Sequence, residues 1–123
     1  MKRILLIEDE ATVRQVIRQM LEEGGYEVVE AEHGVAGLRQ LQAQTVDLVI
    51  TDLFMPEKEG IETIRELHKA YPTVKILAIS GGGRSGRMIF LANATRFGAH
   101  RTLAKPFSRQ ELLDAVATLL AAG

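Results

Sequence analysis

"DLVITD", residues 47–52, is an apolar run that ends at an acid. A strand with one exposed face alternates apolar and polar residues, whereas a strand covered on both faces is apolar throughout. Leu48, Val49 and Ile50 are consecutive apolar residues, and "KILAIS" at residues 75–80 shows a similar pattern. Both runs therefore predict central strands of a parallel sheet that helices cover on both faces.

Each strand signal along the chain is followed by a segment with helical periodicity. Between residues 11 and 23 the apolar residues recur at helical spacing, and two glycines then stop the helix. Ser108 and Glu111 form a capping box, which predicts the start of the last helix. The predicted strands are 4–7, 26–31, 47–52, 74–80 and 100–105, and the predicted helices are 11–23, 34–43, 60–70, 86–97 and 109–121. Five such units predict an α/β fold, a (βα)5 doubly wound parallel sheet with helices on both faces.

Composition limits the classes of function that the chain can have. With 123 residues, 46% of them hydrophobic, we expect one compact domain over residues 1–123. A net charge of −1 argues against direct nucleic-acid binding and against attachment to an anionic membrane. Cysteine is absent, which excludes disulfides and thiolate metal sites. The first apolar run ends in acids without a small-residue cleavage site, which favours a buried strand in a cytoplasmic protein.

Polar side chains stand at the carboxyl ends of the predicted strands. In a doubly wound sheet of order 2-1-3-4-5, ligands bind where the strand order reverses, between the first and third strands. Those strands end in Glu8-Asp9 and Asp52, and three convergent carboxylates favour a cation with oxygen ligands, Mg²⁺. Ser80 and Lys105 end the fourth and fifth strands. Acids for a metal, one acid free to attack, and a lysine with a hydroxyl are typical of phosphoryl transfer.

Four motifs occur in a fixed order, each at the end of a strand: "IEDE", "DLFMPEKEG" fitting D-x-x-M-P-x-x-x-G, the serine at 80, and "KPF" near the end. Together they resemble the receiver domain of two-component response regulators, and the resemblance covers essentially the whole chain. It implies a flavodoxin-like sheet of order 2-1-3-4-5 and a single receiver domain over residues 1–123.

The resemblance assigns a metal site and a phosphoacceptor. It implies that Asp52 accepts the phosphoryl group and that Asp9 binds Mg²⁺ directly. Glu8 resembles an acid that acts on the metal through water, and the backbone carbonyl of Phe54 would be a further ligand.

The resemblance also assigns the groups that would hold and sense the phosphoryl group. Lys105 would pair with it, and the Ser80 hydroxyl and the Gly81 amide would bond it. The peptide between Lys105 and Pro106 would be cis. Family members usually carry an aromatic residue in the middle of the fifth strand, where this chain has Thr102, so the usual aromatic switch is in doubt.

The implied function is signalling rather than enzymatic turnover of another substrate. The protein would catalyse the transfer of a phosphoryl group to itself from a donor, which would be a sensor histidine kinase, a histidine phosphotransfer protein or a small phosphodonor. It would also catalyse its own dephosphorylation. The phosphorylated form would regulate a downstream effector protein or a covalent output domain. A phosphorylation-dependent homodimer is a further expectation from the family.

Two other classes of function compete with this interpretation. "SGGGRSGR", residues 80–87, resembles the loop of a nucleotide- or flavin-binding protein, but Arg87 and Met88 replace the lysine and hydroxyl residue of a P-loop. The other alternative is a degenerate receiver that acts only as a protein interaction module.

The individual site residues have plainer interpretations as well. Asp9 could cap the first helix and Asp52 could stabilise a turn. Ser80 could be a turn hydroxyl and Lys105 a solvated lysine before a proline. Their joint occurrence at one edge of the sheet favours the functional interpretation.

Overall fold

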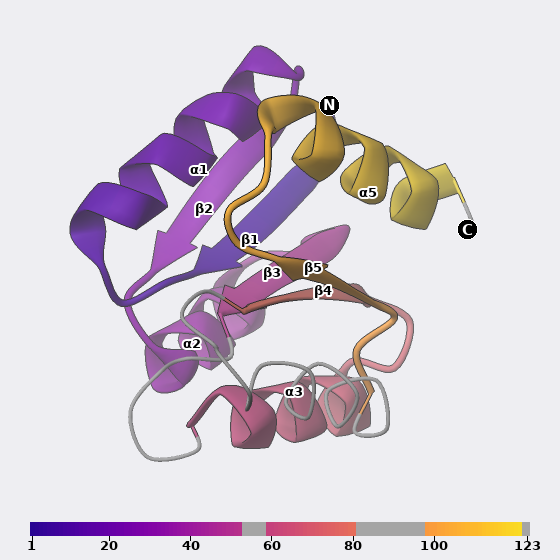
Figure 1. The fold of residues 1–123 in the computed structure, drawn as a ribbon. Coiled ribbons are helices and arrows are strands. Elements are labelled where there is room, and N and C mark those ends of the chain that lie inside the picture. Colours follow the sequence, from indigo (N-terminus) through magenta and orange to yellow (C-terminus); the bar gives the residue numbers. More distant parts are fainter. Residues whose placement is uncertain (53–58, 81–97, 122–123) are drawn as a thin grey trace.

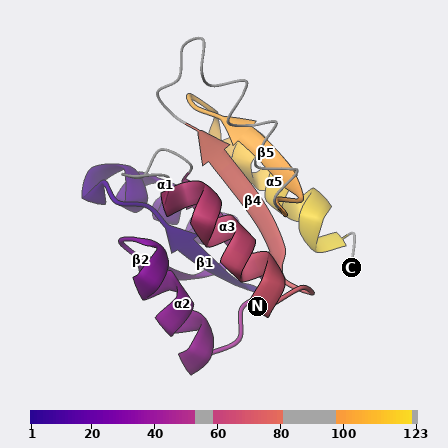
Figure 2. The ribbon, with the colours of Figure 1, turned by 90° about the horizontal axis from the view of Figure 1, so that it is seen from below.

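The fold is a five-stranded parallel sheet with helices on both faces, as the sequence predicts (Figures 1 and 2). The computed structural model describes residues 1–52, 59–80 and 98–121, with the backbone alone for residues 59–61 and 80. The strands, in the spatial order β2-β1-β3-β4-β5, are β1 (Arg3–Ile7), β2 (Glu27–Ala31), β3 (Leu48–Asp52), β4 (Lys75–Ser80) and β5 (Arg101–Ala104). The described helices are α1 (Ala11–Glu23), α2 (Gly34–Ala43), α3 (Glu59–Ala70) and α5 (Arg109–Ala121). The predicted helix 86–97 lies outside the described residues.

The helix bounds agree closely with the prediction. α1, α2 and α5 have the predicted bounds, and α3 begins one residue earlier. The capping box of α5 is confirmed, because the Ser108 Oγ accepts from the Glu111 amide at 3.0 Å and Glu111 Oε1 accepts from the Ser108 amide at 2.8 Å. Among the described helices, none has both the length and the hydropathy needed to cross a membrane.

Helices α1 and α5 cover one face of the sheet and α2 and α3 the other (Figure 1), and each face buries its own apolar cluster. Successive side chains of a strand point to opposite faces. Leu5 and Ile7 of β1 therefore pack with α2 and α3, whereas Ile4 and Leu6 pack with α1 and α5. All four side chains are completely buried. Burial on both sides explains the continuous apolar strands, and the parallel pairing places the carboxyl ends of the strands at one edge of the sheet.

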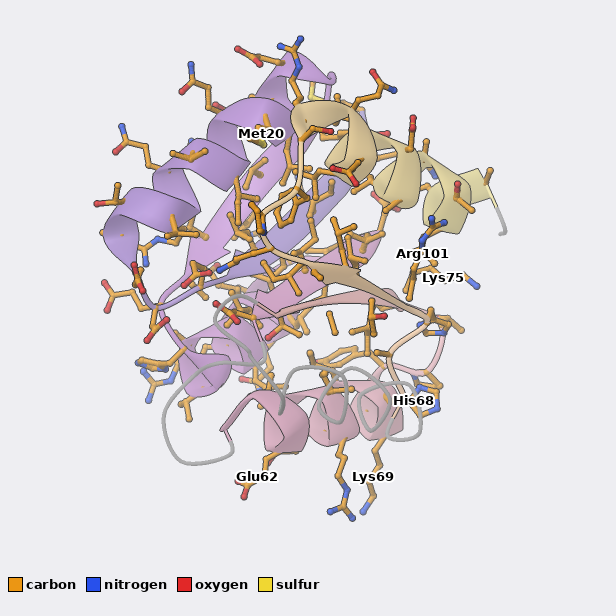
Figure 3. The ribbon with its side chains drawn as sticks, viewed as in Figure 1. Met20, Glu62, His68, Lys69, Lys75 and Arg101 are labelled. Carbon is orange, nitrogen blue, oxygen red and sulfur yellow. The ribbon has the colours of Figure 1, made fainter. Side chains whose placement is uncertain are left out.

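A glycine in the segment before β5 lies against the end of α3. Gly98 has a φ of +130°, a conformation that L residues rarely adopt, and a Cβ there would lie 2.6 Å from the Cβ of His68 in α3 (Figure 3 labels His68). Both backbone strain and a steric clash therefore oppose any side chain at this position.

We expect Gly98→Ala to lower the free energy of unfolding by about 3 kcal/mol, from strain and overpacking combined. Gly25→Ala is the matched control, because Gly25 has a φ of +91° but no heavy atom within 4 Å of the added Cβ. The control should cost about 1 kcal/mol. Urea unfolding of both variants measures the difference, and equal losses would rule out the contact with His68 as a cause.

Candidate functional site

The carboxyl ends of β1 and β3 place two acids side by side. Ile7 of β1 pairs with Thr51 of β3, so the next residues along the chain, Glu8 and Asp52, are neighbours. Asp9 follows Glu8 directly. One carboxylate oxygen from each of Glu8, Asp9 and Asp52 lies within 4.8 Å of the other two. The structure thus brings together three of the acids that the sequence analysis singled out.

The three acids differ in their exposure. Glu8 is 1% exposed and Asp52 is 4% exposed, whereas Asp9 is exposed to solvent. Burial raises the pKa of Glu8 from its ordinary value of 4.5 to about 7, and a hydrogen bond with Asp52 adds to the rise. Glu8 therefore carries a proton part of the time near neutral pH.

Lys105 lies directly after β5 and places a positively charged ammonium group in the site. Its Nζ donates to Glu8 Oε1 and to Asp52 Oδ2, each at 3.0 Å. Burial by itself would lower the pKa of Lys105, but the bonds to the two carboxylates outweigh it and raise the pKa. The side chain thus stays protonated with its ammonium between the buried acids. The peptide between Lys105 and Pro106 is cis, in the isomer that the family resemblance implies.

The donor set fits Mg²⁺. All three clustered side chains offer carboxylate oxygens, the ligands that a hard divalent cation prefers. Asp9 is exposed, so a hydrated ion could reach the cluster from solvent. Phe54, the predicted carbonyl ligand, lies outside the described residues.

The other predicted residues are placed in part. Ser80 is the last residue of β4 and pairs with Ala104, the residue immediately before Lys105. The structure describes only the backbone of Ser80. Thr102 is half-buried in β5 and pairs with Ala78. Gly81 lies outside the described residues. The structure therefore places the end of the Ser80 strand beside the Lys105 strand.

The plain interpretation of Asp9 as a helix cap does not match the start of α1. The N-cap residue is Glu10, whose side chain makes no capping hydrogen bond. The Glu10 amide instead donates to Glu8 Oε2 at 3.1 Å. The helix start thus contributes a donor to the buried acid.

One contact of the site was missed by the sequence analysis. Nη1 of Arg14 in α1 donates to the backbone carbonyl of Glu8 at 2.7 Å. Side chains of a helix point toward its N-terminus, so an arginine in the first turns can reach the loop that precedes the helix. That direction is the signal in the sequence by which the contact could have been found.

The chain matches the family model of the response regulator receiver domain over residues 4–117. It is 33% identical over 115 residues to the chemotaxis protein CheY of Bacillus subtilis, with 93% of each chain covered. It is 39% identical over 126 residues to a probable transcriptional regulatory protein of Picosynechococcus, covering 96% of this chain but 49% of that protein. Among solved structures, a response regulator receiver domain protein of Clostridium thermocellum has a TM-score of 0.90 at 32% identity, covering 99% of this chain and 96% of that one. The chain thus spans nearly all of one relative and about half of another.

Proposed function

Since the chain belongs to the response regulator receiver domain family, we propose that it accepts a phosphoryl group on Asp52 and thereby switches a signalling pathway. The donor would be the phosphohistidine of a sensor histidine kinase or of a histidine phosphotransfer protein, or a small phosphodonor. The observation that carries the proposal is the Lys105 ammonium, held 3.0 Å from an oxygen of the buried Asp52.

The proposed reaction is an in-line displacement at phosphorus. A carboxylate oxygen of Asp52 forms the new bond to phosphorus, and the bond to the donor nitrogen or oxygen breaks, with its electron pair leaving on the donor. Lys105 keeps its proton and turns from the carboxylates to the phosphoryl oxygens, whose negative charge it stabilises. In dephosphorylation water would attack the same phosphorus, the bond between phosphorus and the Asp52 oxygen would break, and inorganic phosphate would leave with Asp52 restored as a carboxylate.

The acids of the site have a second role in this proposal. Glu8, Asp9 and Asp52 would hold Mg²⁺, with the Phe54 carbonyl as a further ligand. When bound, the ion would neutralise the carboxylates and the incoming phosphoryl oxygens. The proposed setting is the cytoplasm, which suits a chain without cysteine.

The output of the proposed switch is a change of partner. New charge on Asp52 would attract the Ser80 hydroxyl and the Gly81 amide, and the half-buried Thr102 would take the place of the usual aromatic residue. We propose that residues 1–123 act as one receiver domain on an effector protein or a covalent output domain, with a phosphorylation-dependent homodimer as a further form. The chain matches about half of the length of two transcriptional regulators, which supports the output-domain alternative.

Intact-mass measurement after incubation with acetyl phosphate tests the proposal. With Mg²⁺ the wild-type protein should gain the mass of one phosphoryl group, because the cation would offset the negative charges of the three acids and of the incoming group. A chelator should prevent the gain, and hydroxylamine should reverse it, as it does for acyl phosphates. A protein that gains no mass under these conditions would instead be a phosphorylation-independent interaction module.

A further inference from the structure

The loop between β1 and α1 carries two of the clustered acids, and a side chain of the helix holds its first carbonyl. The Glu8 amide donates to the Ala31 carbonyl of β2 at 3.0 Å, which continues the sheet ladder by one residue. The Glu8 carbonyl accepts from Nη1 of Arg14 at 2.7 Å. This carbonyl belongs to the peptide that leads to Asp9, so the Arg14 contact restrains the direction in which the chain leaves Glu8.

Arg14 is itself held from a second side. Its side chain is 15% exposed, and its Nε forms an ion pair with Glu30 Oε1 of β2 at 3.3 Å. Glu30 also forms an ion pair with Arg18, whose Nε bonds Glu22 Oε2 at 3.1 Å. The Arg14 guanidinium therefore spans two acceptors, one in β2 and one in the loop. A planar guanidinium with several separated donors is suited to such a bridge, whereas an ammonium is a single point charge.

We propose that Arg14 is a positioning residue for the metal site: by tying the Glu8 carbonyl to Glu30 of β2, it sets how the carboxylates of Glu8 and Asp9 are presented to the cation. The inference rests on the proposed function, because it requires that these acids bind a divalent ion. Arg14 touches neither the ion nor the phosphoryl group in this scheme. Groups that orient metal ligands affect metal affinity by 10–100-fold in general.

The test measures Mn²⁺ binding to the unphosphorylated protein from the EPR signal of the free ion, since Mn²⁺ accepts the same oxygen ligands as Mg²⁺. We expect Arg14→Ala to weaken Mn²⁺ binding by about 10-fold. Arg14→Lys should weaken it less, because an ammonium can still donate to the Glu8 carbonyl or to Glu30 but lacks the fixed, separated donors with which the guanidinium spans the two. If Arg14→Ala does not fold, Arg14→Lys carries the comparison with the wild type.

Arg18→Ala is the matched control, because Arg18 lies on the same helix and pairs with the same Glu30, and with Glu22. It should lower thermal stability and leave Mn²⁺ affinity unchanged. Equal affinity of Arg14→Ala and wild type, or equal losses in Arg14→Ala and Arg18→Ala, would overturn the positioning role and leave the proposed function intact. A wild-type protein that binds no Mn²⁺ would overturn both.

Discussion

Asp52→Asn is expected to abolish phosphorylation by acetyl phosphate while leaving the protein folded. The carboxylate of Asp52 is the proposed nucleophile, and a carboxamide has no anionic oxygen to attack phosphorus. Asparagine has nearly the same shape as aspartate, and it places no charge next to Glu8, which is 1% exposed. Intact mass should therefore show no added phosphoryl group in the variant under conditions that convert the wild type fully.

Asp114→Asn provides the matched control for this experiment. Asp114 lies on the exposed side of α5, where its Oδ1 accepts from Gln110 Nε2 at 2.7 Å, so the same chemical change occurs away from the site. This variant should be phosphorylated like the wild type. If Asp52→Asn still gained one phosphoryl group that hydroxylamine removes, another acid would have to be the acceptor.

Lys105→Met should slow phosphorylation by about 100-fold, the usual cost of removing one charged donor from a developing anion. The same substitution should leave Mg²⁺ affinity unchanged or raise it. The Lys105 ammonium bonds Glu8 and Asp52 in the metal-free protein, so it competes with the ion for their oxygens. The rate is measured by the appearance of phosphorylated mass, and the affinity by competition of Mg²⁺ with Mn²⁺.

Lys75→Met is the control for loss of a lysine in general. Lys75 begins β4 and pairs with Leu48 at the start of β3, the end of the sheet opposite to Asp52 (Figure 3 labels Lys75). It should change neither the rate nor the affinity. If Lys105→Met lost both phosphorylation rate and Mg²⁺ affinity, this would contradict the proposal that Lys105 acts on the phosphoryl group while the acids bind the ion.

The fold could be predicted because local signals agree with the long-range pattern. α1 ends at its predicted residue since Gly24 and Gly25 follow it, and α5 begins where its capping box predicts. The strand starts were less accurate: β3 begins one residue later than predicted. There the Asp47 carboxylate accepts from the Arg3 amide at 2.8 Å, a bond between residues 44 positions apart that no local pattern reveals.

The candidate site was predictable as a set of residues but not as a charge distribution. Strand ends identify which side chains meet at one edge of a parallel sheet, and the structure brings Glu8, Asp9 and Asp52 together there. Glu8 and Asp9 are adjacent acids in the sequence, yet one is buried and the other exposed. The pKa of about 7 at Glu8, and the ammonium shared with Asp52, depend on packing and on distances between atoms of distant strands. The roles of all these residues in phosphorylation and metal binding, and those of Phe54 and Gly81, stay predictions.

The charges of the site come from three remote parts of the chain: Lys105 lies 97 positions from Glu8 and 53 from Asp52. A ribosome releases the N-terminal part of a chain first. A nascent chain whose residue 105 is still inside the ribosome therefore has both acids but lacks the ammonium that bonds them in the complete fold.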